Sequence, residues 1–220
     1  MVIGAGGFGR EALDVALAIN TASAELKWEI VGVADDSPSE RNLARLAARG
    51  VAYLGPVDVL NGSEPSTFVA IGVGAPAARR RVFGQVETMG LTQASLVHPT
   101  AIMGSQVVLG KGVIVCGGVS IGTNVSLGRA VHLNPNAVIG HDAWLEDFVS
   151  INPNATISGE CRIGSAALVG ASAVVLQALT IAGGALVGAG ACVTRSVEAD
   201  VTVVGIPARN HPTVSEGSQT

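Results

Sequence analysis

Apolar residues recur with a period of six over the second half of the chain. From Ala101 the sequence reads AIMGSQ, VVLGKG, VIVCGG and onward through 16 hexapeptides without a gap, the last ending at Ser196. The third place is Met, Leu, Val or Ile in every block, and the first is Ala, Val, Cys or Leu. Because alternate residues of a strand point to the same side, places one and three share a face and the other residues turn a corner. The pattern predicts a solenoid of stacked β coils and argues against a sandwich.

Residues 1–97 follow a different pattern, in which short apolar runs alternate with helix-like segments. VIGAGGFGRE is typical of a strand, a glycine turn and a helix start, and EALDVALAIN continues that helix with apolar spacings of three and four. WEIVGVADD and TFVAIGVG indicate two further strands, and APAARRRVFGQVETMG indicates a helix that ends at Gly90. We therefore predict a small parallel α/β domain of three to four strands.

Composition narrows the class of protein. Hydrophobic residues make up 48% of the chain but aromatic residues only 3%, which favours thin, regular aliphatic layers. The net charge is −4, with no basic cluster beyond the arginines at 79–81, so a nucleic-acid partner is not expected. No apolar run reaches the roughly 18 residues of a membrane span. The N-terminus runs straight into a glycine loop, so we expect no signal peptide. The three cysteines lack metal-ligand spacing. We expect a cytoplasmic protein with reduced thiols and no metal.

The repeat blocks, the preceding HPTA at 98–101, and LVGAGACVTRSV followed by VVGIPARN resemble the hexapeptide-repeat acyltransferases. Their fold is a left-handed parallel β-helix with three hexapeptides in each coil, so residues 18 apart would stack. With VIGAGGFGREALD and the acids at 35 and 36, the whole chain resembles the sugar acyltransferases of the NeuD and PglD type. We expect a Rossmann-like nucleotide-sugar domain at 1–97, a β-helix acyltransferase domain at 98–210 and a polar tail at 211–220.

One histidine interrupts the repeat at a corner. His141 is the fifth residue of AVIGHD, outside the buried places one and three, and is therefore accessible. Asp142 can hold one ring nitrogen and leave the other as a free base, and Gly159, 18 residues on, can offer a bare N–H to an oxyanion. The resemblance places the general base of the family at His141. A solvated surface histidine is the alternative.

The resemblance also implies the donor and the assembly. The donor would be acetyl-CoA, held largely by backbone groups in a groove between the β-helices of a homotrimer. By position, the contacts would come from Gly159, Ala171, Gly188 and Ala189. A covalent route through Cys116, Cys161 or Cys192 is disfavoured, because each cysteine occupies an apolar or small place in its block.

The glycine turn suits a phosphate. GAGGFG matches G-x-G-x-x-G between a strand and a helix. An NAD domain is the alternative, but fewer than 100 residues leave room for one mononucleotide unit only. We favour a nucleotide-linked amino sugar, most often UDP-linked in the relatives. Its expected contacts are Gly7, Phe8 and Gly9 for the diphosphate, Asp35 and Asp36 for the base or ribose, and Asn134 near the acceptor group.

Several positions stay open. Asn134 can instead be a turn-forming residue of NPN, and Arg79 is either an anion ligand or a solvated helix charge. Where relatives read FVHIxPGA, this chain reads FVSINPNA, so Ser150 replaces a histidine. Phe8 also stands at a position where relatives often carry a histidine. His98 and His132 are expected to be structural.

The predicted function is acetyl transfer from acetyl-CoA to the amino group, or a hydroxyl, of a sugar by direct attack. The alternatives are a sialic acid O-acetyltransferase and a trimeric scaffold that has lost catalysis.

Overall fold

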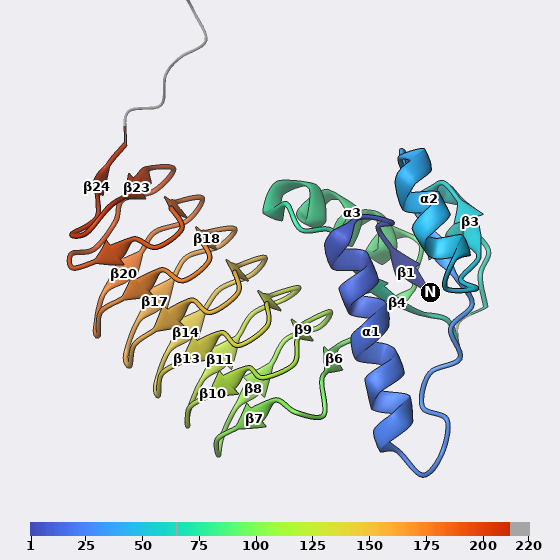
Figure 1. Cartoon of the computed structure of the whole chain (residues 1–220), viewed down its shortest axis with the longest axis horizontal. Helices are drawn as coiled ribbons and strands as arrows, with labels where there is room; N and C mark the ends of the chain where they lie inside the picture. Colours follow the sequence, from blue (N-terminus) through green and yellow to red (C-terminus); the bar gives the residue numbers. More distant parts are fainter. Residues whose placement is uncertain (65, 212–220) are drawn as a thin grey trace, which may run out of the picture.

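The computed structural model describes residues 1–64 and 66–211, which form an α/β domain followed by a solenoid of β coils (Figure 1). Apart from residue 211, the predicted polar tail lies outside the described residues.

The α/β domain is a parallel five-stranded sheet with the strand order β3-β2-β1-β4-β5. Its strands are β1 (Val2–Ile3), β2 (Val33–Ala34), β3 (Tyr53–Gly55), β4 (Phe68–Ile71) and β5 (Thr92–Gln93). Its helices are α1 (Gly7–Ala22), α2 (Glu40–Ala47), the 3-10 turn η1 (Val57–Leu60) and α3 (Pro76–Thr88). The predicted strands and helices are confirmed, while α2, β3 and β5 were not predicted. The strand order reverses between β1 and β4, where open α/β sheets bind ligands.

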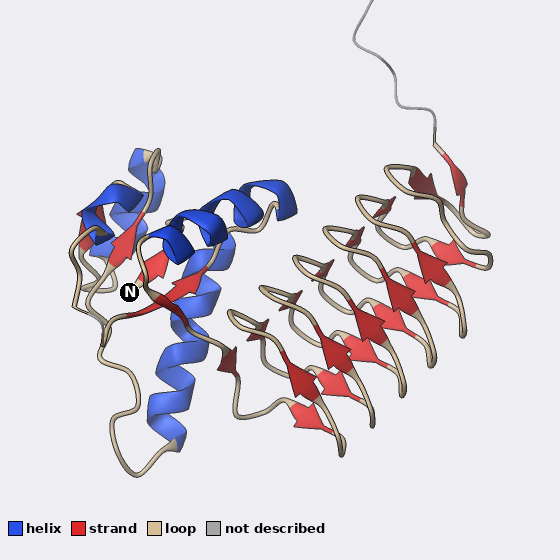
Figure 2. Cartoon of the chain, turned by 180° about the vertical axis from the view of Figure 1, so that it is seen from behind, coloured by secondary structure: helices blue, strands red, loops and turns tan. Residues whose placement is uncertain are grey.

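The solenoid has three flat faces, one for each hexapeptide of a coil (Figure 2). Face 1 consists of β6 (Leu96–Val97), β9 (Ile114–Val115), β12 (His132–Leu133), β15 (Ser150–Ile151), β18 (Leu168–Val169), β21 (Leu186–Val187), β23 (Thr202–Val204) and β24 (Arg209–Asn210). Face 2 consists of β7 (Ile102–Met103), β10 (Ser120–Ile121), β13 (Val138–Ile139), β16 (Thr156–Ile157), β19 (Val174–Val175) and β22 (Cys192–Val193). Face 3 consists of β8 (Val108–Leu109), β11 (Ser126–Leu127), β14 (Trp144–Leu145), β17 (Arg162–Ile163) and β20 (Thr180–Ile181).

The register confirms the period of the repeat. Ser120 pairs with Val138, and Val138 pairs with Thr156, each 18 residues further along a parallel ladder. First and third places such as Ala137 and Ile139 are buried in one continuous aliphatic core. The fold is the left-handed parallel β-helix that the resemblance implied.

The corners depend on a backbone conformation that the hexapeptide pattern did not reveal. Every sixth place from Gln106 to Gly190 has a positive φ, between 48° and 71°. Glycine, asparagine and aspartate adopt this left-handed region most readily, but Phe148 adopts it too, at 63°. Asp142 is one of these sixth-place residues, with φ 58°, so it turns the corner directly after His141.

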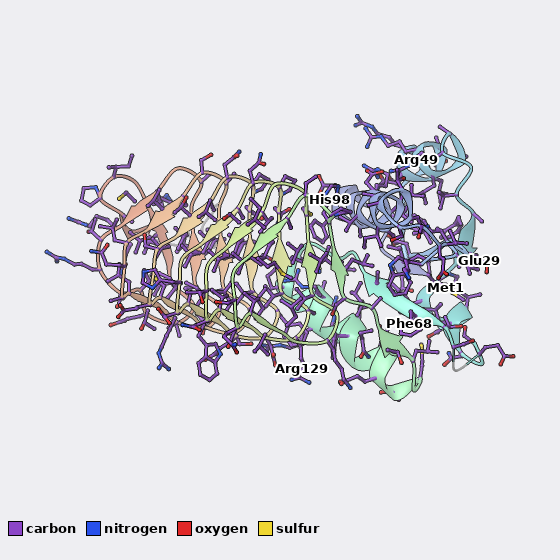
Figure 3. The ribbon with its side chains drawn as sticks, turned by 90° about the horizontal axis from the view of Figure 1, so that it is seen from below. Met1, Glu29, Arg49, Phe68, His98 and Arg129 are labelled. Atoms are coloured by element: carbon purple, nitrogen blue, oxygen red, sulfur yellow. The ribbon has the colours of Figure 1, made fainter. Side chains whose placement is uncertain are left out.

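The α/β domain docks on face 1 of the β-helix. Helix α1 contacts β6, and Leu96 and Ile114 belong to the same buried cluster as residues of α1. At the other side of the contact, Phe83 and Phe148 meet edge to face, with ring centroids 5.5 Å apart. Arg129 (Figure 3) covers this aromatic pair from outside and binds Asp147 at 2.8 Å. The docking leaves faces 2 and 3 uncovered by the α/β domain.

Candidate active site

His141 lies in the corner between β13 and β14, on the outside of the coil. Its Nδ1 is 2.7 Å from Oδ2 of Asp142, and the side chain is 58% exposed, as predicted. The amide of Asn124, one coil earlier, donates to the other oxygen of Asp142 at 3.0 Å. The stacked coils therefore fix the carboxylate, and the carboxylate orients the ring.

Asp142 also sets the tautomer of the ring. The hydrogen bonds from Asn124 and from His141 lower the pKa of this carboxyl group below its ordinary value. An ionised carboxylate can only accept, so Nδ1 carries the proton and Nε2 keeps its lone pair. The arrangement makes Nε2 a base that is open to solvent.

The ring of His141 packs over the bare backbone of Gly159. A Cβ at Gly159 would lie 2.6 Å from Nε2, too close for the ring to stay in this position. The coil-to-coil hydrogen bond here runs from the N–H of Glu160 to the carbonyl of His141, at 2.9 Å, so the ladder does not use the N–H of Gly159. The predicted stacking of Gly159 on His141 is confirmed as geometry, and it brings a free N–H close to the base.

Two of the cysteines are poor nucleophiles. Burial, together with the charge of Glu11, raises the pKa of Cys116 to about 12. Burial also raises the pKa of Cys161, whose Sγ donates to the carbonyl of Leu176 at 3.1 Å. A thiol that stays protonated cannot attack a thioester efficiently.

A second concave site lies between the two domains. A cavity of about 390 Å³ separates the N-terminus of α1 and the β4–α3 loop from face 1 of the β-helix. It is lined by Gly7, Phe8, Glu11, Gly74, Ala75, His132, Asn134, Ser150, Asn152 and Leu168. We call it the crevice. It brings together three of the predicted acceptor residues, Gly7, Phe8 and Asn134.

The glycine turn at the end of β1 is shaped by close packing. Gly4 has φ 109°, and a Cβ at Gly9 would lie 1.7 Å from the carbonyl oxygen of Gly4. A Cβ at Gly72, after β4, would lie 2.4 Å from Cα of Gly9. Gly9 is thus packed between β1 and β4 and does not line the crevice, whereas nothing lies near Gly6. The turn leaves its backbone open on the side of the crevice.

The two predicted base or ribose contacts brace loops. Asp35 accepts from the N–H of Ala5 at 2.7 Å, and Asp36 accepts from the N–H of Val57 at 2.8 Å. Neither carboxylate lines the crevice. The predicted contacts to acetyl-CoA lie at two different corners of the β-helix. Gly159 lies beside His141, whereas Ala171, Gly188 and Ala189 lie in the corner between faces 1 and 2.

Comparisons with known proteins agree with this architecture. Residues 1–86 match the family model of the PglD N-terminal domain. The acetyltransferase domain of PglB from Neisseria gonorrhoeae, solved with acetyl coenzyme A, is 27% identical with TM-score 0.81, over 96% of this chain and 97% of that one. WeeI from Acinetobacter baumannii is 26% identical with TM-score 0.82, over 96% and 98%. PerB from Caulobacter crescentus, solved with CoA and GDP-perosamine, is 25% identical with TM-score 0.83, over 96% of both chains. No curated protein matches by sequence.

Residues 1–86 thus belong to the PglD N-terminal domain family, and the chain as a whole has the two-domain fold of the hexapeptide-repeat sugar acyltransferases of the NeuD/PglD type.

In this acyltransferase, Arg79 is neither the anion ligand nor the solvated charge that the sequence suggested. It is fully buried between the domains. Its guanidinium donates to the carbonyls of Val73 and Gly74 on one side and of Ala130 and Phe148 on the other, at 2.6 to 2.9 Å. A signal was present in the sequence, because Arg79 shares the buried stripe of α3 with Phe83 and Val86.

Arg79 also accounts for the departure at position 150. Its remaining N–H donates to Oγ of Ser150 at 2.8 Å, so the serine that replaces the histidine of relatives is bound into the domain contact. Burial lowers the pKa of Arg79 to about 9, and the group stays cationic at neutral pH. The acyltransferase thus has a buried cation behind Ser150 of the crevice wall, with every N–H on a protein oxygen.

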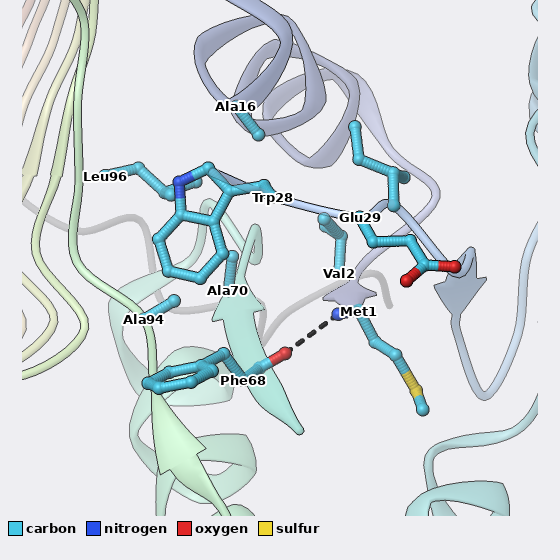
Figure 4. A pocket seen from close by; sticks show the side chains of 10 residues that line it. Met1, Val2, Ala16, Trp28, Glu29, Phe68, Ala70, Ala94 and Leu96 are labelled. Carbon is cyan, nitrogen blue, oxygen red and sulfur yellow. Dashed lines mark hydrogen bonds between the residues drawn. The ribbon is translucent and has the colours of Figure 1, made fainter. Parts of the chain in front are cut away.

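Two other features are structural in the acyltransferase. His98, at the entry to the β-helix (Figure 3), accepts from the N–H of Thr100 at 3.1 Å, in line with the structural role expected for it. An apolar hollow under Trp28 (Figure 4), beside the N-terminal ammonium bound to the carbonyl of Phe68, has a volume of about 30 Å³. That volume holds only one or two waters. Within the described ranges, no group of His, Cys, Asp and Glu side chains converges on a metal position.

Proposed function

We propose that this acyltransferase moves an acetyl group from acetyl-CoA to the amino group of a nucleotide-linked amino sugar, with His141 as the general base. The observation that carries the proposal is the His141–Asp142 pair, whose Nε2 is free and lies over Gly159. The acetyl coenzyme A bound to the PglB domain and the GDP-perosamine bound to PerB support the classes of donor and acceptor.

The chemistry needs one base and one oxyanion donor. Nε2 of His141 accepts the proton of the amine while the nitrogen attacks the thioester carbonyl. The N–H of Gly159 donates to the tetrahedral oxyanion. When the C–S bond breaks, His141 returns the proton to the leaving thiolate. A positioned base of this kind contributes on the order of 10² to 10⁴ in rate.

The crevice is the proposed acceptor site. Helix α1 starts at Gly7 without a side-chain cap and without an acid in its first turn, so its N–H groups and dipole favour an anion such as the diphosphate. Phe8 and Asn134 would then contact the rest of the acceptor. We keep a UDP-linked sugar as the predicted acceptor. A GDP-linked sugar is the alternative, because PerB was solved with GDP-perosamine.

We also propose that the enzyme is a homotrimer of about 66 kDa, three times 22.0 kDa. Asn134 precedes the corner at which face 2 begins, while His141 lies in the corner at which it ends, and His141 does not line the crevice. A neighbouring copy would bring its His141 to this crevice. The second places of face 2 carry no charge and include Ile102 and Val138, exposed by 69% and 40%, as a subunit contact requires.

Thiol release from acetyl-CoA tests the activity. A UDP-linked amino sugar, GDP-perosamine and free sialic acid are the acceptors, and we expect release with a nucleotide-linked amino sugar. Release with sialic acid alone would establish the O-acetyltransferase alternative. Absence of release and of acetyl-CoA binding would leave the scaffold.

Mixed oligomers test the shared site. His141→Ala and Asn134→Ala chains are each expected to be nearly inactive, but co-expressed chains pair an intact His141 with an intact crevice in about a quarter of the sites of a cyclic oligomer. Activity at that fraction supports a site between copies. If mixing restores nothing, both groups act within one chain. Light scattering that shows a monomer would also reject the trimer.

A further inference from the structure

One buried side chain of the crevice has no hydrogen-bond partner among the described residues. His132, the second residue of its hexapeptide on face 1, is 1% exposed, and neither ring nitrogen makes a hydrogen bond to any described group. Buried polar groups in native proteins are nearly always paired. Two unpaired nitrogens on one ring are not explained by the fold and indicate a partner that the chain does not supply.

The surroundings of His132 hold the ring in place without satisfying it. Phe8 stacks on one side, with ring centroids 4.2 Å apart and planes 23° apart. The strand neighbour in the next coil is Ser150, whose hydroxyl accepts from Arg79. The guanidinium of Arg79 is itself fully used on protein oxygens. The ring therefore has a fixed orientation and lines the crevice beside Asn134 and Ser150.

His132 is neutral in the folded protein. Burial, followed by the nearby charge of Arg79, places its pKa well below the ordinary value. The carbonyl of Ile71 approaches the ring without the geometry of a proper hydrogen bond, and it only partly offsets this shift. A neutral imidazole has one donor and one acceptor nitrogen. A hydroxyl group, which also donates and accepts, matches it, whereas a carboxylate or an ammonium matches only half of it.

We propose that His132 hydrogen-bonds a hydroxyl of the acceptor sugar and is a specificity-determining residue of the crevice. The inference rests on the proposed function, because it takes the crevice as the acceptor site. Asn134, Asn152 and Ser150 surround the same volume with amide and hydroxyl groups, which suit a polyhydroxylated ring. Phe8 packs on the face of the His132 ring, so the sugar hydroxyl would meet the ring edge, where the two buried nitrogens have no protein partner among the described residues.

His132→Phe separates a ligand contact from a structural role. Phenylalanine keeps a ring against Phe8 and removes two unpaired buried nitrogens, so the melting temperature should rise. The KM of the acceptor should nevertheless rise about tenfold or more, since a lost hydrogen bond to the sugar is worth about that factor, with a smaller change in kcat and unchanged acetyl-CoA affinity. His98→Phe is the matched control and should leave the acceptor KM unchanged.

The acceptor KM of a folded His132→Phe enzyme decides the matter. A value within twofold of wild type would overturn the proposal, whatever happens to the melting temperature. If the phenylalanine variant does not fold, His132→Leu removes the same nitrogens at smaller volume and is judged by the same limit.

Calorimetry with GDP-perosamine and with a UDP-linked amino sugar separates this inference from the proposed function. Binding to wild type without acetyl transfer, weakened by His132→Phe, would keep the His132 contact and reject the transferase. If wild type binds neither nucleotide sugar, both proposals fall.

Discussion

Two histidines nine positions apart show how differently this protein builds its two candidate sites. His141 is 58% exposed, is bound to Asp142 and stands at a corner that contributes nothing to the aliphatic core. His132 is 1% exposed, has no hydrogen-bond partner in the part of the chain that the structure describes, and lies where two domains meet. A repeat corner can therefore carry chemistry with little effect on folding, while the crevice links ligand binding to stability. Substitutions at the corner should therefore change turnover with little effect on stability, whereas substitutions at the crevice should change both ligand binding and stability.

The largest effect is expected at the centre of the domain contact. Arg79→Met leaves at least four backbone carbonyls without their donor, and it should lower the free energy of unfolding by at least ~3 kcal/mol. Arg80→Met is the matched control, since Arg80 is exposed and should change stability by less than ~1 kcal/mol. Denaturant titration measures both. Equal, small losses would mean that the contact between the domains does not depend on Arg79.

A methyl group under the base comes next in size. Gly159→Ala puts a Cβ where the ring of His141 now lies, so the imidazole must move. A displacement of about 1 Å at a reacting group costs up to about 10²-fold, and we expect turnover to fall 10- to 100-fold with little change in melting temperature. Gln177→Ala, in the same corner column one coil further, is the control. Full activity of the alanine enzyme would remove Gly159 from the site.

Asp142→Asn sharpens the account of the corner. Asparagine tolerates the left-handed backbone at this position, so the fold should be unchanged. The amide is neutral and holds the ring less firmly, so kcat/KM should fall about tenfold, less than for loss of the base itself, because one charge-assisted hydrogen bond is lost. A loss of kcat/KM larger than that of His141→Ala would mean that His141 is not the base.

The smallest expected effect is a pH dependence of stability that comes from His132 in the crevice. The folded-state pKa of His132 lies well below 6.5, while the unfolded chain titrates near 6.5. Below about pH 6.5 the unfolded state therefore binds a proton that the folded state does not, and stability falls as the pH falls. The slope of this contribution is at most about 1.4 kcal/mol per pH unit. Denaturant titrations of wild type and His132→Phe should diverge progressively as the pH falls below about 6.5, with Arg79 and Glu11 the neighbouring charges common to both. Parallel curves would contradict the assignment.

The two regions also differ in how far the sequence predicts them. The hexapeptide period predicted every strand from β7 to β22, the burial of places one and three, and the exposure of His141, because each depends only on local repetition. The left-handed sixth place was not predicted, since Ala and Phe occupy it as well as Gly and Asn. The crevice depends on how two domains meet, which no local pattern contains. For that reason the burial of Arg79, its bond to Ser150 and the unpaired ring of His132 could not be predicted, although the stripe formed by Arg79, Phe83 and Val86 indicated that this arginine faces inward.

The central claim is that His141 is the base, and turnover of His141→Ala under saturating acetyl-CoA and acceptor tests it most directly. We predict a fall of about 10² to 10⁴, with the melting temperature, the oligomeric state and the affinity for acetyl-CoA unchanged, because the corner side chain lies outside the core. An alanine enzyme that keeps more than about a third of wild-type turnover, when chemistry limits the rate, would contradict the account and leave His141 as a surface residue.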